Sequence, residues 1–536
     1  MPRQAFAAEA REAGRLGHPA VVLGSLRRTD RTTGEAEWPH IEDPSLELSR
    51  AFERVAEDLE AFATRLTASG QTEAGEIIGA SVHIARDPEL RQLVDDQVAA
   101  GEAVESAIDD VIEHFARILT QLPDPTLAAR AADIRAVGRR LIAAVCGGSI
   151  RTDEAESARR LILVAREITA DDLLVHAATV AGAATVVGGA TSHAAIIARS
   201  LGVPLIFGAD PGILDAPDGT DVLLDVDTGM VVLQPDVDER RMAEEAVATM
   251  MSRRAELVAA RALPVSTRDG REITVLANVA AAADADVATS MGTAGVGLLR
   301  TEMPFLTAQR WPTVAEHVAQ LSAVTQRLAG LPVTIRTLDF ADDKLPPFLR
   351  AGRIGSLGRS LPLMLTEPDA FSRQIQAILS VSSEYRLDVR IMIPMVASAE
   401  EISSCRDLVD GVAVRMGVPV PPVGSMIELA EAVVAVDAIA ARSDFLSIGT
   451  NDLTASVLRL DRRDPSLTTT RVLEPPVLGA VERVVRAGAR RGRPVSICGD
   501  AASDPSVIPE LLRVGCRTLS VAPSMMDEVR AAIRDL

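Results

Sequence analysis

Short apolar runs alternate with helix-like stretches over the second half of this 536-residue chain, from Ile273 onward. Strands that alternate with helices are typical of parallel sheets, which leaves few possible architectures. Seven runs have strand character, and an eighth, weaker candidate lies near Leu357. Eight strand–helix repeats predict a (β/α)8 barrel. The seven runs are ITVLANV, GVGLLRTE, VTIRTLD, VRIMIPMV, VGSMIEL, FLSIGTND and PVSICGD.

Charged or polar residues stand at the ends of several of these runs. We expect them at the C-terminal ends of the barrel strands, where (β/α)8 enzymes carry their chemistry. This end of the barrel, the barrel mouth, is therefore the predicted active site. The residues are Arg300, Glu302, Arg336, Asp339, Glu428, Asn451, Asp452, Cys498 and Asp500.

The first half of the chain has two other patterns. From about residue 45 to 141, apolar residues such as Leu48 and Phe52 recur at spacings of three and four, and four such stripes predict roughly four packed helices. From Leu161 to about Gln234, the short runs LILVA, ATVVGG, VPLIFG and DVLLDV predict the strands of a compact α/β unit. A Glu- and Arg-rich stretch then predicts a helical connector to the barrel.

Composition excludes some classes of function. The formal net charge of −20 argues against binding nucleic acid through the phosphate backbone; it is compatible with docking a basic partner or with an ordinary solvated acidic surface. No apolar stretch is long enough to span a bilayer, and the N-terminal residues contain no apolar signal core. We therefore expect a cytoplasmic protein without membrane insertion. The four cysteines lack CxxC spacing, which argues against a disulfide framework or a zinc site.

One of only seven histidines lies in the segment GGATSHAAIIARSLG, Gly188–Gly202. Thr191 or Ser192 can cap the helix that follows, and Gly202 can end it. His193 then lies in the first turn, where the helix dipole disfavours imidazolium and the backbone N–H groups favour an anion. A neutral histidine that accepts a phosphoryl group suits this position. A capping or buried histidine is the alternative.

The segment GGATSHAAIIARSLGVPLIFG resembles the phosphohistidine signature of enzymes that use phosphoenolpyruvate: Enzyme I of the sugar phosphotransferase system, pyruvate phosphate dikinase and phosphoenolpyruvate synthase. GVGLLRTE, TIRTLD, SIGTNDLT and ICGD resemble the barrel motifs of the same family, in the same order. The dikinases and synthases carry a large nucleotide-binding domain, for which we expect no room before His193. The helical insert is instead similar to the part of Enzyme I that docks the small carrier protein HPr.

The resemblance implies a function. We expect a phosphoenolpyruvate–protein phosphotransferase that passes the phosphoryl group of phosphoenolpyruvate through His193 to a histidine of an HPr-type carrier and releases pyruvate, as the first step of sugar uptake. The alternative is a diverged regulatory phosphoprotein that binds phosphoenolpyruvate or a carrier with weak turnover. A homodimer formed through the barrel is implied as well. The sequence names neither the carrier nor the sugars.

The implied fold is multidomain α/β, with a helical subdomain inserted in a phosphohistidine α/β swivelling domain, followed by a C-terminal (β/α)8 TIM barrel. The predicted division is 1–20 with 147–235 for the phosphohistidine domain, 21–146 for the helical subdomain, 236–264 for the linker and 265–536 for the barrel.

The resemblance also assigns substrate-binding residues. Arg300, Arg336 and Arg462 resemble the family's substrate-binding arginines, and guanidinium groups suit both anions of phosphoenolpyruvate because they form paired, directed hydrogen bonds. Lys344 is the one lysine in a chain that otherwise uses arginine. We therefore expect Lys344 to line the substrate site, as a compact charge where a planar guanidinium would not fit; a chance surface lysine is the alternative.

Glu428 and Asp452 resemble the ligands of Mg²⁺, a cation that prefers carboxylates, substrate oxygens and water and would neutralise phosphate and enolate charge. Asn451 and Asp452 are expected to contact the substrate. Cys498 matches the residue that protonates the enolate carbon. Three motifs depart from the family pattern, namely FADDK, IGSLGR and IELA, so the pocket lining is altered and activity need not match that of typical members.

Overall fold

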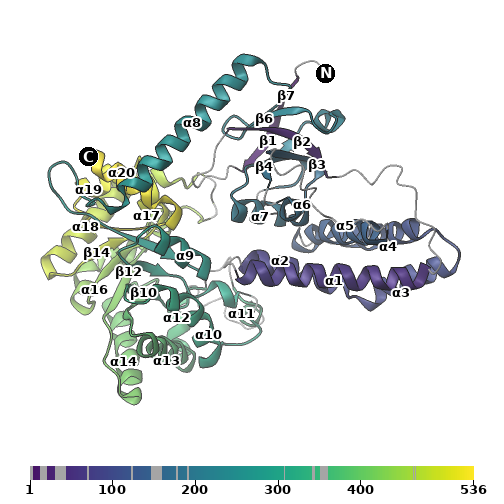
Figure 1. Cartoon of the computed structure of the whole chain (residues 1–536). Coiled ribbons are helices and arrows are strands. Elements are labelled where there is room, and N and C mark those ends of the chain that lie inside the picture. The colour runs from purple at the N-terminus through teal and green to yellow at the C-terminus, as the bar shows by residue number, and fades with distance from the viewer. Residues whose placement is uncertain are drawn as a thin grey trace. The chain divides into compact units, whose positions relative to one another are not determined.

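The structure is a computed structural model of the whole chain (Figure 1). It forms two compact units, Met1–Arg254 and Ala255–Leu536. Within the described ranges, no helix is both long and apolar enough to cross a membrane. The structure describes residues 4–12, 21–29, 44–68, 72–121, 125–145, 160–176, 179–189, 192–306, 308–340, 345–350, 360–462, 464 and 466–536.

A closed sheet lies at the centre of the first unit, with its strands in the order β1-β5-β4-β3-β2-β6-β7 (Figure 1). The four runs predicted as strands fall in β3, β4, β5 and β6, whereas β1, β2 and β7 are not among the predicted strands. β2 lies on the helical side of the boundary predicted at residue 21, but it pairs with β3 and β6 in the sheet. The strands are β1 Gln4–Glu12, β2 Val21–Arg28, β3 Leu161–Glu167, β4 Val180–Val187, β5 Leu205–Ala209, β6 Asp221–Asp225 and β7 Met230–Leu233.

β3 shows why the sheet needs cover on both faces. Its side chains alternate in direction, so that Ile162 and Val164 join one core while Leu163 and Ala165 join the other. The second core is completed by the helical subdomain and by the short helices α6 and α7, Ala170–Val175 and His193–Leu201. The helix that begins at His193 is therefore held by packing against the body of the unit.

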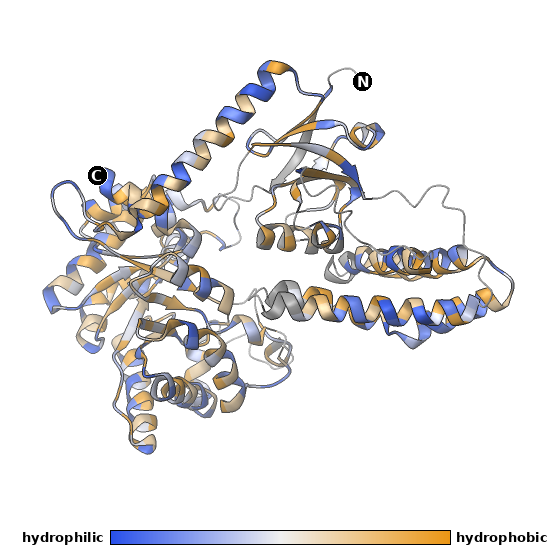
Figure 2. Ribbon diagram, in the orientation of Figure 1, coloured by the Kyte–Doolittle hydropathy of each residue, from blue (hydrophilic) through white to orange (hydrophobic). Residues whose placement is uncertain are grey.

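The helical subdomain is inserted between β2 and β3 and contains five helices in its described part. The predicted stripes fall in α1, α3, α4 and α5, and Figure 2 shows the alternation of hydrophobic and hydrophilic residues along α1. The fifth helix, α2, was not expected because Gly75 and Gly79 weaken its helical pattern, but it packs along α1. The helices are α1 Pro44–Ala68, α2 Thr72–Ala85, α3 Pro88–Ala99, α4 Val104–Thr120 and α5 Pro125–Val145.

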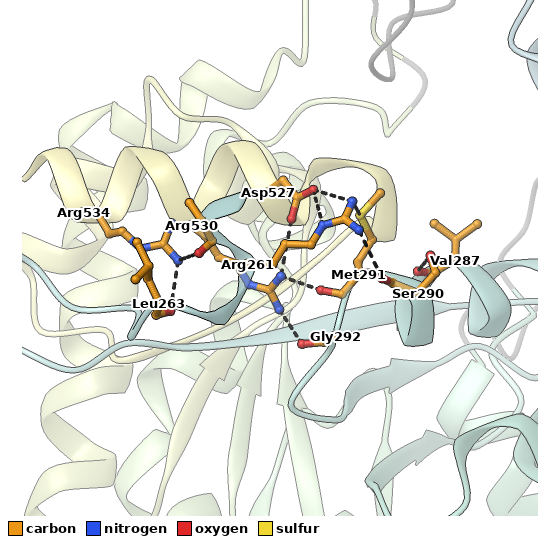
Figure 3. A network of polar contacts seen from close by, with 10 residues as sticks. Arg261, Leu263, Val287, Ser290, Met291, Gly292, Asp527, Arg530 and Arg534 are labelled. Carbon is orange, nitrogen blue, oxygen red and sulfur yellow. Dashed lines mark hydrogen bonds and ion pairs between the residues drawn. The ribbon is translucent and has the colours of Figure 1, made fainter. Parts of the chain in front are cut away.

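The predicted connector forms the long helix α8, Val237–Ala259. Polar contacts attach the chain just after α8 to the last helix, α20, Met526–Asp535 (Figure 3). The Nε of Arg261 donates to Asp527 at 2.8 Å, and Nη2 of Arg534 donates to the carbonyl groups of residues 260 and 263 at 2.8 and 3.1 Å. The C-terminal end of the connector is thus fixed to the second unit.

The second unit is a closed barrel of eight parallel strands, in the order β10-β11-β12-β13-β14-β15-β8-β9. All seven runs predicted as strands occur in it, and the predicted fold class is confirmed. The strands are β8 Thr274–Val279, β9 Val296–Leu299, β10 Pro332–Arg336, β11 Asp388–Ile393, β12 Val423–Ile427, β13 Leu446–Ile448, β14 Val495–Ile497 and β15 Thr518–Val521. Besides α20, the helices are α9 Ala282–Ser290, α10 Val314–Thr325, α11 Pro347–Arg350, α12 Ser360–Thr366, α13 Pro368–Tyr385, α14 Ala399–Met416, α15 Ala430–Val434, α16 Val436–Arg442, α17 Thr450–Leu458, α18 Pro475–Arg491 and α19 Ile508–Arg513.

The eighth strand is not the one predicted. β10 pairs directly with β11 in the closed barrel, whose eight described strands include none near Leu357; that residue lies outside the described ranges. β15 closes the barrel by pairing with β14 and β8. Its four residues, TLSV, include two hydroxyl side chains, and its burial follows from the packing of its neighbours rather than from its own hydrophobicity.

The interior of the barrel has an apolar and a polar side. Leu298, Met392, Met426 and Phe445 form a small apolar cluster together with Cys498. The polar side is formed by two hydrogen-bonded pairs, Ser447 with Ser496 and Asn278 with Ser520.

Candidate active site

The predicted site residues of the barrel follow the C-terminal ends of five strands. Because the strands are parallel, these ends meet at one mouth. Arg300 follows β9, Arg336 ends β10, Glu428 follows β12, Cys498 follows β14, and Asn451 and Asp452 lie in the first turn of α17, after β13.

Arg336 is held between two acidic side chains at the mouth. Its Nη2 lies 2.6 Å from Oε1 of Glu302, and its Nη1 lies 3.0 Å from Oδ2 of Asp339. Burial alone would lower the pKa of Arg336, but the charges of Asp339, Glu302 and Glu428 outweigh it and raise the pKa. The Nε of Arg336 is buried and has no hydrogen-bond partner among the described residues.

A buried glutamine ties the ends of β9 and β10 together. Gln374, on α13, is fully buried; its Oε1 accepts from the backbone N–H of Leu338 at 2.9 Å, and its Nε2 donates to Oγ1 of Thr301 at 2.9 Å. Thr301 in turn donates to the carbonyl oxygen of Arg336 at 2.9 Å. The main chain beside Arg300 and Arg336 is therefore fixed by hydrogen bonds from outside the barrel.

Glu428 is a buried carboxyl group close to two other acidic side chains, so its charged form is destabilised. It is 1% exposed, and its Oε1 accepts from the backbone N–H of Met395 at 2.7 Å. Met395 has a φ of 54°, a left-handed conformation that is rare for such a side chain. Burial, and then the charges of Asp339 and Asp452, raise the pKa of Glu428 to about 8, although Arg336 and the Met395 N–H act in the opposite direction.

Asp452 and Asn451 extend the site along α17. The Nη1 of Arg462 lies 3.4 Å from Oδ1 of Asp452. The Nδ2 of Asn451 donates to Asp500 at 2.9 Å, and the backbone N–H of Asp500 donates back to Oδ1 of Asn451 at 3.0 Å. These two reciprocal hydrogen bonds fix the orientation of the Asn451 side-chain amide at the mouth.

The chemistry of Glu428 and Asp452 fits a divalent cation. Their mutual repulsion raises the pKa of Glu428, and a positive ion placed between them would remove that repulsion. The described part of the chain contains no group of three or more His, Cys, Asp or Glu side chains arranged around a metal. The protein alone therefore offers two carboxylates, and the other ligands would be substrate oxygens and water, as Mg²⁺ commonly has.

Cys498 follows β14, packs beside the apolar cluster of the barrel interior and is 2% exposed. Its Sγ donates to the carbonyl oxygen of Ile448 at 3.6 Å. Burial raises the pKa of the thiol to about 11, while a hydrogen bond from Ser447 and the charges of Arg336 and Arg300 act against the increase. At neutral pH the thiol carries its proton, which is the state that a proton donor needs.

His193 belongs to the first unit and begins α7. Ser192 caps this helix, because its Oγ accepts from the backbone N–H of Ala195 at 3.2 Å. Gly202, with a φ of 68°, follows the last residue, and the N–H of Val203 donates to the carbonyl of residue 198 at 2.8 Å, which completes a Schellman end. Both predicted helix ends are confirmed, whereas the side chain of His193 lies outside what the structure describes.

Lys344 lies outside the described residues, as does Arg359 of the altered motif IGSLGR. The structure thus brings six predicted residues to one mouth: Arg300, Arg336, Asn451, Asp452, Glu428 and Cys498. Arg462 adjoins them through Asp452.

Three family models match the chain. The model of the PEP-utilising enzyme N-terminal domain matches residues 14–130, that of the mobile domain matches 158–229, and that of the PEP-binding domain matches 254–536. The chain belongs to the PEP-utilising enzyme family. The resemblance to Enzyme I is confirmed by curated relatives along almost the whole chain.

Among these relatives, the phosphoenolpyruvate-protein phosphotransferase of Streptomyces coelicolor is 31% identical, over 96% of this chain and 91% of the relative. The multiphosphoryl transfer protein of Rhodobacter capsulatus is 36% identical, over 84% of this chain and 54% of the relative. The multiphosphoryl transfer protein of Xanthomonas campestris is 32% identical, over 96% of this chain and 62% of the relative. The chain therefore spans between half and two thirds of the length of the two multiphosphoryl transfer proteins.

The sequence interpretation missed some residues that support the site in this member of the PEP-utilising enzyme family. Gln374 carried a signal, since it lies on the apolar stripe of α13 with Phe371 and Ile378. Thr450 did not, because its importance comes from packing: its Oγ1 is buried without a hydrogen-bond partner among the described residues, and any side chain at Gly499 would collide with it.

Proposed function

We propose that this chain is a phosphoenolpyruvate–protein phosphotransferase that carries the phosphoryl group on His193. The observation that supports this proposal most directly is the gathering of the buried Glu428, the half-buried Asp452, two arginines and a protonated thiol at one barrel mouth. The names of the similar proteins support the same reaction class. Release of pyruvate, and an HPr-type carrier as acceptor, are the finer parts of the proposal.

Arg336 would bind the substrate through its guanidinium group, which Glu302 and Asp339 hold in place. Arg300 and Arg462 stand at the same mouth, and together the three guanidinium groups can meet a phosphate and a carboxylate. The amide of Asn451, already oriented by Asp500, would add a hydrogen bond to the substrate. Lys344 stays a predicted member of this site.

Glu428 and Asp452 would hold Mg²⁺, which when bound supplies positive charge beside the phosphate and the enolate oxygen. His193 would attack phosphorus in line, while the arginines hold the phosphoryl group in position. Cys498 would then transfer its proton to the enolate carbon and yield pyruvate.

The helical subdomain α1–α5 would dock the carrier protein. His193 would then have to reach both the substrate and the carrier, so we propose that its domain swings on the connector α8, as the description of the matching mobile-domain model suggests. The predicted division into phosphohistidine domain, helical subdomain, linker and barrel belongs to the same proposal, as does a homodimer formed through the barrel.

The test is incubation of the purified full-length protein with phosphoenolpyruvate and Mg²⁺, followed by detection of acid-labile phosphohistidine and pyruvate. We expect His193→Ala to fold and to take no phosphate, while the matched variant His114→Ala, which changes an exposed histidine of the helical subdomain, behaves as wild type. Phosphorylation that persists in His193→Ala would reject the assignment. Binding of phosphoenolpyruvate without pyruvate release, with every carrier tested, would instead favour the regulatory phosphoprotein.

A further inference from the structure

A second polar site lies at the end of the barrel opposite the mouth. Asp444 and Arg493 lie two residues before β13 and β14, and because the strands are parallel, these beginnings meet at the end that the proposed mechanism does not use. Here a pocket of about 240 Å³ is lined by α14, the end of α16 and the segments that lead into the two strands. Its charged lining residues are Arg406, Arg442, Arg493, Asp407, Asp410 and Asp444.

One wall of the pocket is a single face of α14. Ser403, Arg406, Asp407 and Asp410 follow one another at spacings of three, one and three residues, which places their side chains on the same side of the helix. α14 packs against α16, whose last residue is Arg442 (Figure 1). The pocket is therefore built on regular elements of the barrel.

Asp444 is neutralised within the protein. Its Oδ2 accepts from Nη1 of Arg406 at 2.8 Å and from the backbone N–H of Val423 at 2.9 Å. Burial acts to raise the pKa of Asp444, but these hydrogen bonds and the charge of Arg406 outweigh it and lower the pKa. Asp444 is thus ionised at neutral pH, and Arg406 balances its charge.

Two other arginines of the pocket are not balanced in this way. The Nη1 of Arg493 lies 4.0 Å from Oδ1 of Asp444, and its Nε is buried without a hydrogen-bond partner in the part of the chain that the structure describes. Arg442 is exposed, and its guanidinium group forms no hydrogen bond or ion pair with the described residues. Neither group has a carboxylate at hydrogen-bonding distance.

Two aspartates of the pocket are in the corresponding position. Asp407 and Asp410 are exposed, and among the described residues their carboxylates form no hydrogen bond or ion pair. Although they share one small pocket with Arg442 and Arg493, no ion pair joins them to these arginines. Unpaired charges of both signs therefore line the same space.

We propose that this pocket binds a small zwitterion of the amino-acid class. The carboxylate of the ligand would bind Arg493 and Arg442, because a guanidinium group offers a carboxylate two parallel hydrogen bonds. Its ammonium group would donate to Asp407 and Asp410. The volume suits such a ligand, since pockets for drug-sized molecules begin at roughly 300 Å³.

Ligands that carry one kind of charge fit this lining less well. An anion alone would lie beside two unpaired aspartates, and a cation alone would lie beside two unpaired arginines. Like charges placed together weaken binding, whereas a molecule that carries both charges can match both sets of side chains. The arrangement of charge thus favours the zwitterion.

The test is isothermal titration calorimetry of the purified full-length protein with each standard amino acid in turn. The N-acetyl form of an amino acid that binds lacks the ammonium charge, and its amide form lacks the carboxylate. We expect each of these forms to bind roughly tenfold or more weakly than the parent amino acid. Inorganic phosphate and 1,4-diaminobutane serve as probes with a single kind of charge.

Variants place the ligand in the pocket. Arg493→Gln and Asp410→Asn should each weaken binding roughly tenfold or more. The matched controls are Arg491→Gln and Glu400→Gln, which change exposed side chains of α18 and α14 that do not line the pocket; both should bind as wild type. Asp410→Asn changes an exposed side chain and keeps the test available if Arg493→Gln fails to fold.

The outcomes that would overturn the proposal are distinct. Absence of binding by every amino acid would overturn it, and so would unchanged binding in folded Arg493→Gln and Asp410→Asn proteins. Equal binding of the N-acetyl form, the amide form, phosphate or the diamine would show that one charge is sufficient and would overturn the zwitterion. None of these measurements depends on phosphoryl transfer, so they leave the proposed function to its own test.

Discussion

At the scale of single residues, Glu428 at the barrel mouth is the side chain whose charge the fold affects most clearly. Glu428 is close to the charges of Asp339, Asp452 and Arg336, and its pKa in the metal-free folded state is raised to about 8. In the unfolded chain the same carboxyl group loses its proton near its ordinary pKa of 4.5. The folded state therefore binds more protons between these two pH values, so this group makes stability fall as pH rises from about 4.5 to about 8. A bound cation would reverse the effect.

We expect Glu428→Gln to remove this part of the pH dependence, because the amide does not titrate. At pH near 8, addition of Mg²⁺ should raise the Tm of the wild type by roughly 3 °C or more, and that of Glu428→Gln much less. Thermal unfolding with and without Mg²⁺ measures both effects, with the exposed Glu431→Gln on α15 as control. Equal Mg²⁺ stabilisation of wild type and Glu428→Gln would contradict the metal assignment.

At the scale of elements, helix α13 positions the C-terminal ends of strands β9 and β10 through the side chain of Gln374. Gln374 reaches the turn after β10 and the residue after Arg300, so a helix on the outside of the barrel positions the residues of the mouth. An apolar side chain at this position would fill the space but leave the N–H of Leu338 and the hydroxyl of Thr301 without this partner. The N–H of Leu338 would then be buried and unpaired, which costs roughly 1–3 kcal/mol, whereas the Thr301 hydroxyl keeps its hydrogen bond to the carbonyl oxygen of Arg336.

Gln374→Leu is therefore expected to lower the free energy of unfolding by roughly 2 kcal/mol and to lower kcat/KM for phosphoenolpyruvate at least roughly tenfold. Gln376→Leu is the control, because Gln376 lies on the same helix and is exposed. Denaturant unfolding and phosphorylation kinetics of the two variants provide the comparison. If the folded Gln374→Leu protein retained wild-type kinetics, Gln374 would have a purely structural role.

At the scale of the whole molecule, the predicted site residues are divided between the two compact units. His193 lies in Met1–Arg254, and the arginines, carboxylates and thiol of the mouth lie in Ala255–Leu536. The contacts of Arg261 with Asp527 and of Arg530 with the chain after α9 lie entirely within the second unit. The α/β and helical parts of the first unit share a common core, so they should fold together.

A fragment of residues 1–254 is expected to exchange phosphate between His193 and a phosphorylated carrier, but to take none from phosphoenolpyruvate, because the proposed substrate site belongs to the other unit. Circular dichroism would establish that the fragment is folded, and transfer of ³²P from phosphorylated HPr-type carriers would measure the exchange. A folded fragment that is inert toward carriers active with the full chain would contradict the docking role of α1–α5.

The barrel, its seven clearest strands and the residues that follow them could be predicted from the amino-acid sequence, because buried parallel strands are almost continuously apolar and end abruptly at polar residues. The capped helix at His193 could be predicted as well, because caps are local. The pairing of β15 with β8, the place of β2 in the first sheet and the hydrogen bond between Ser447 and Ser496 became apparent only from the three-dimensional fold. Each of these depends on pairing or hydrogen bonds between residues far apart in the chain, which leave little or no periodic trace in the sequence.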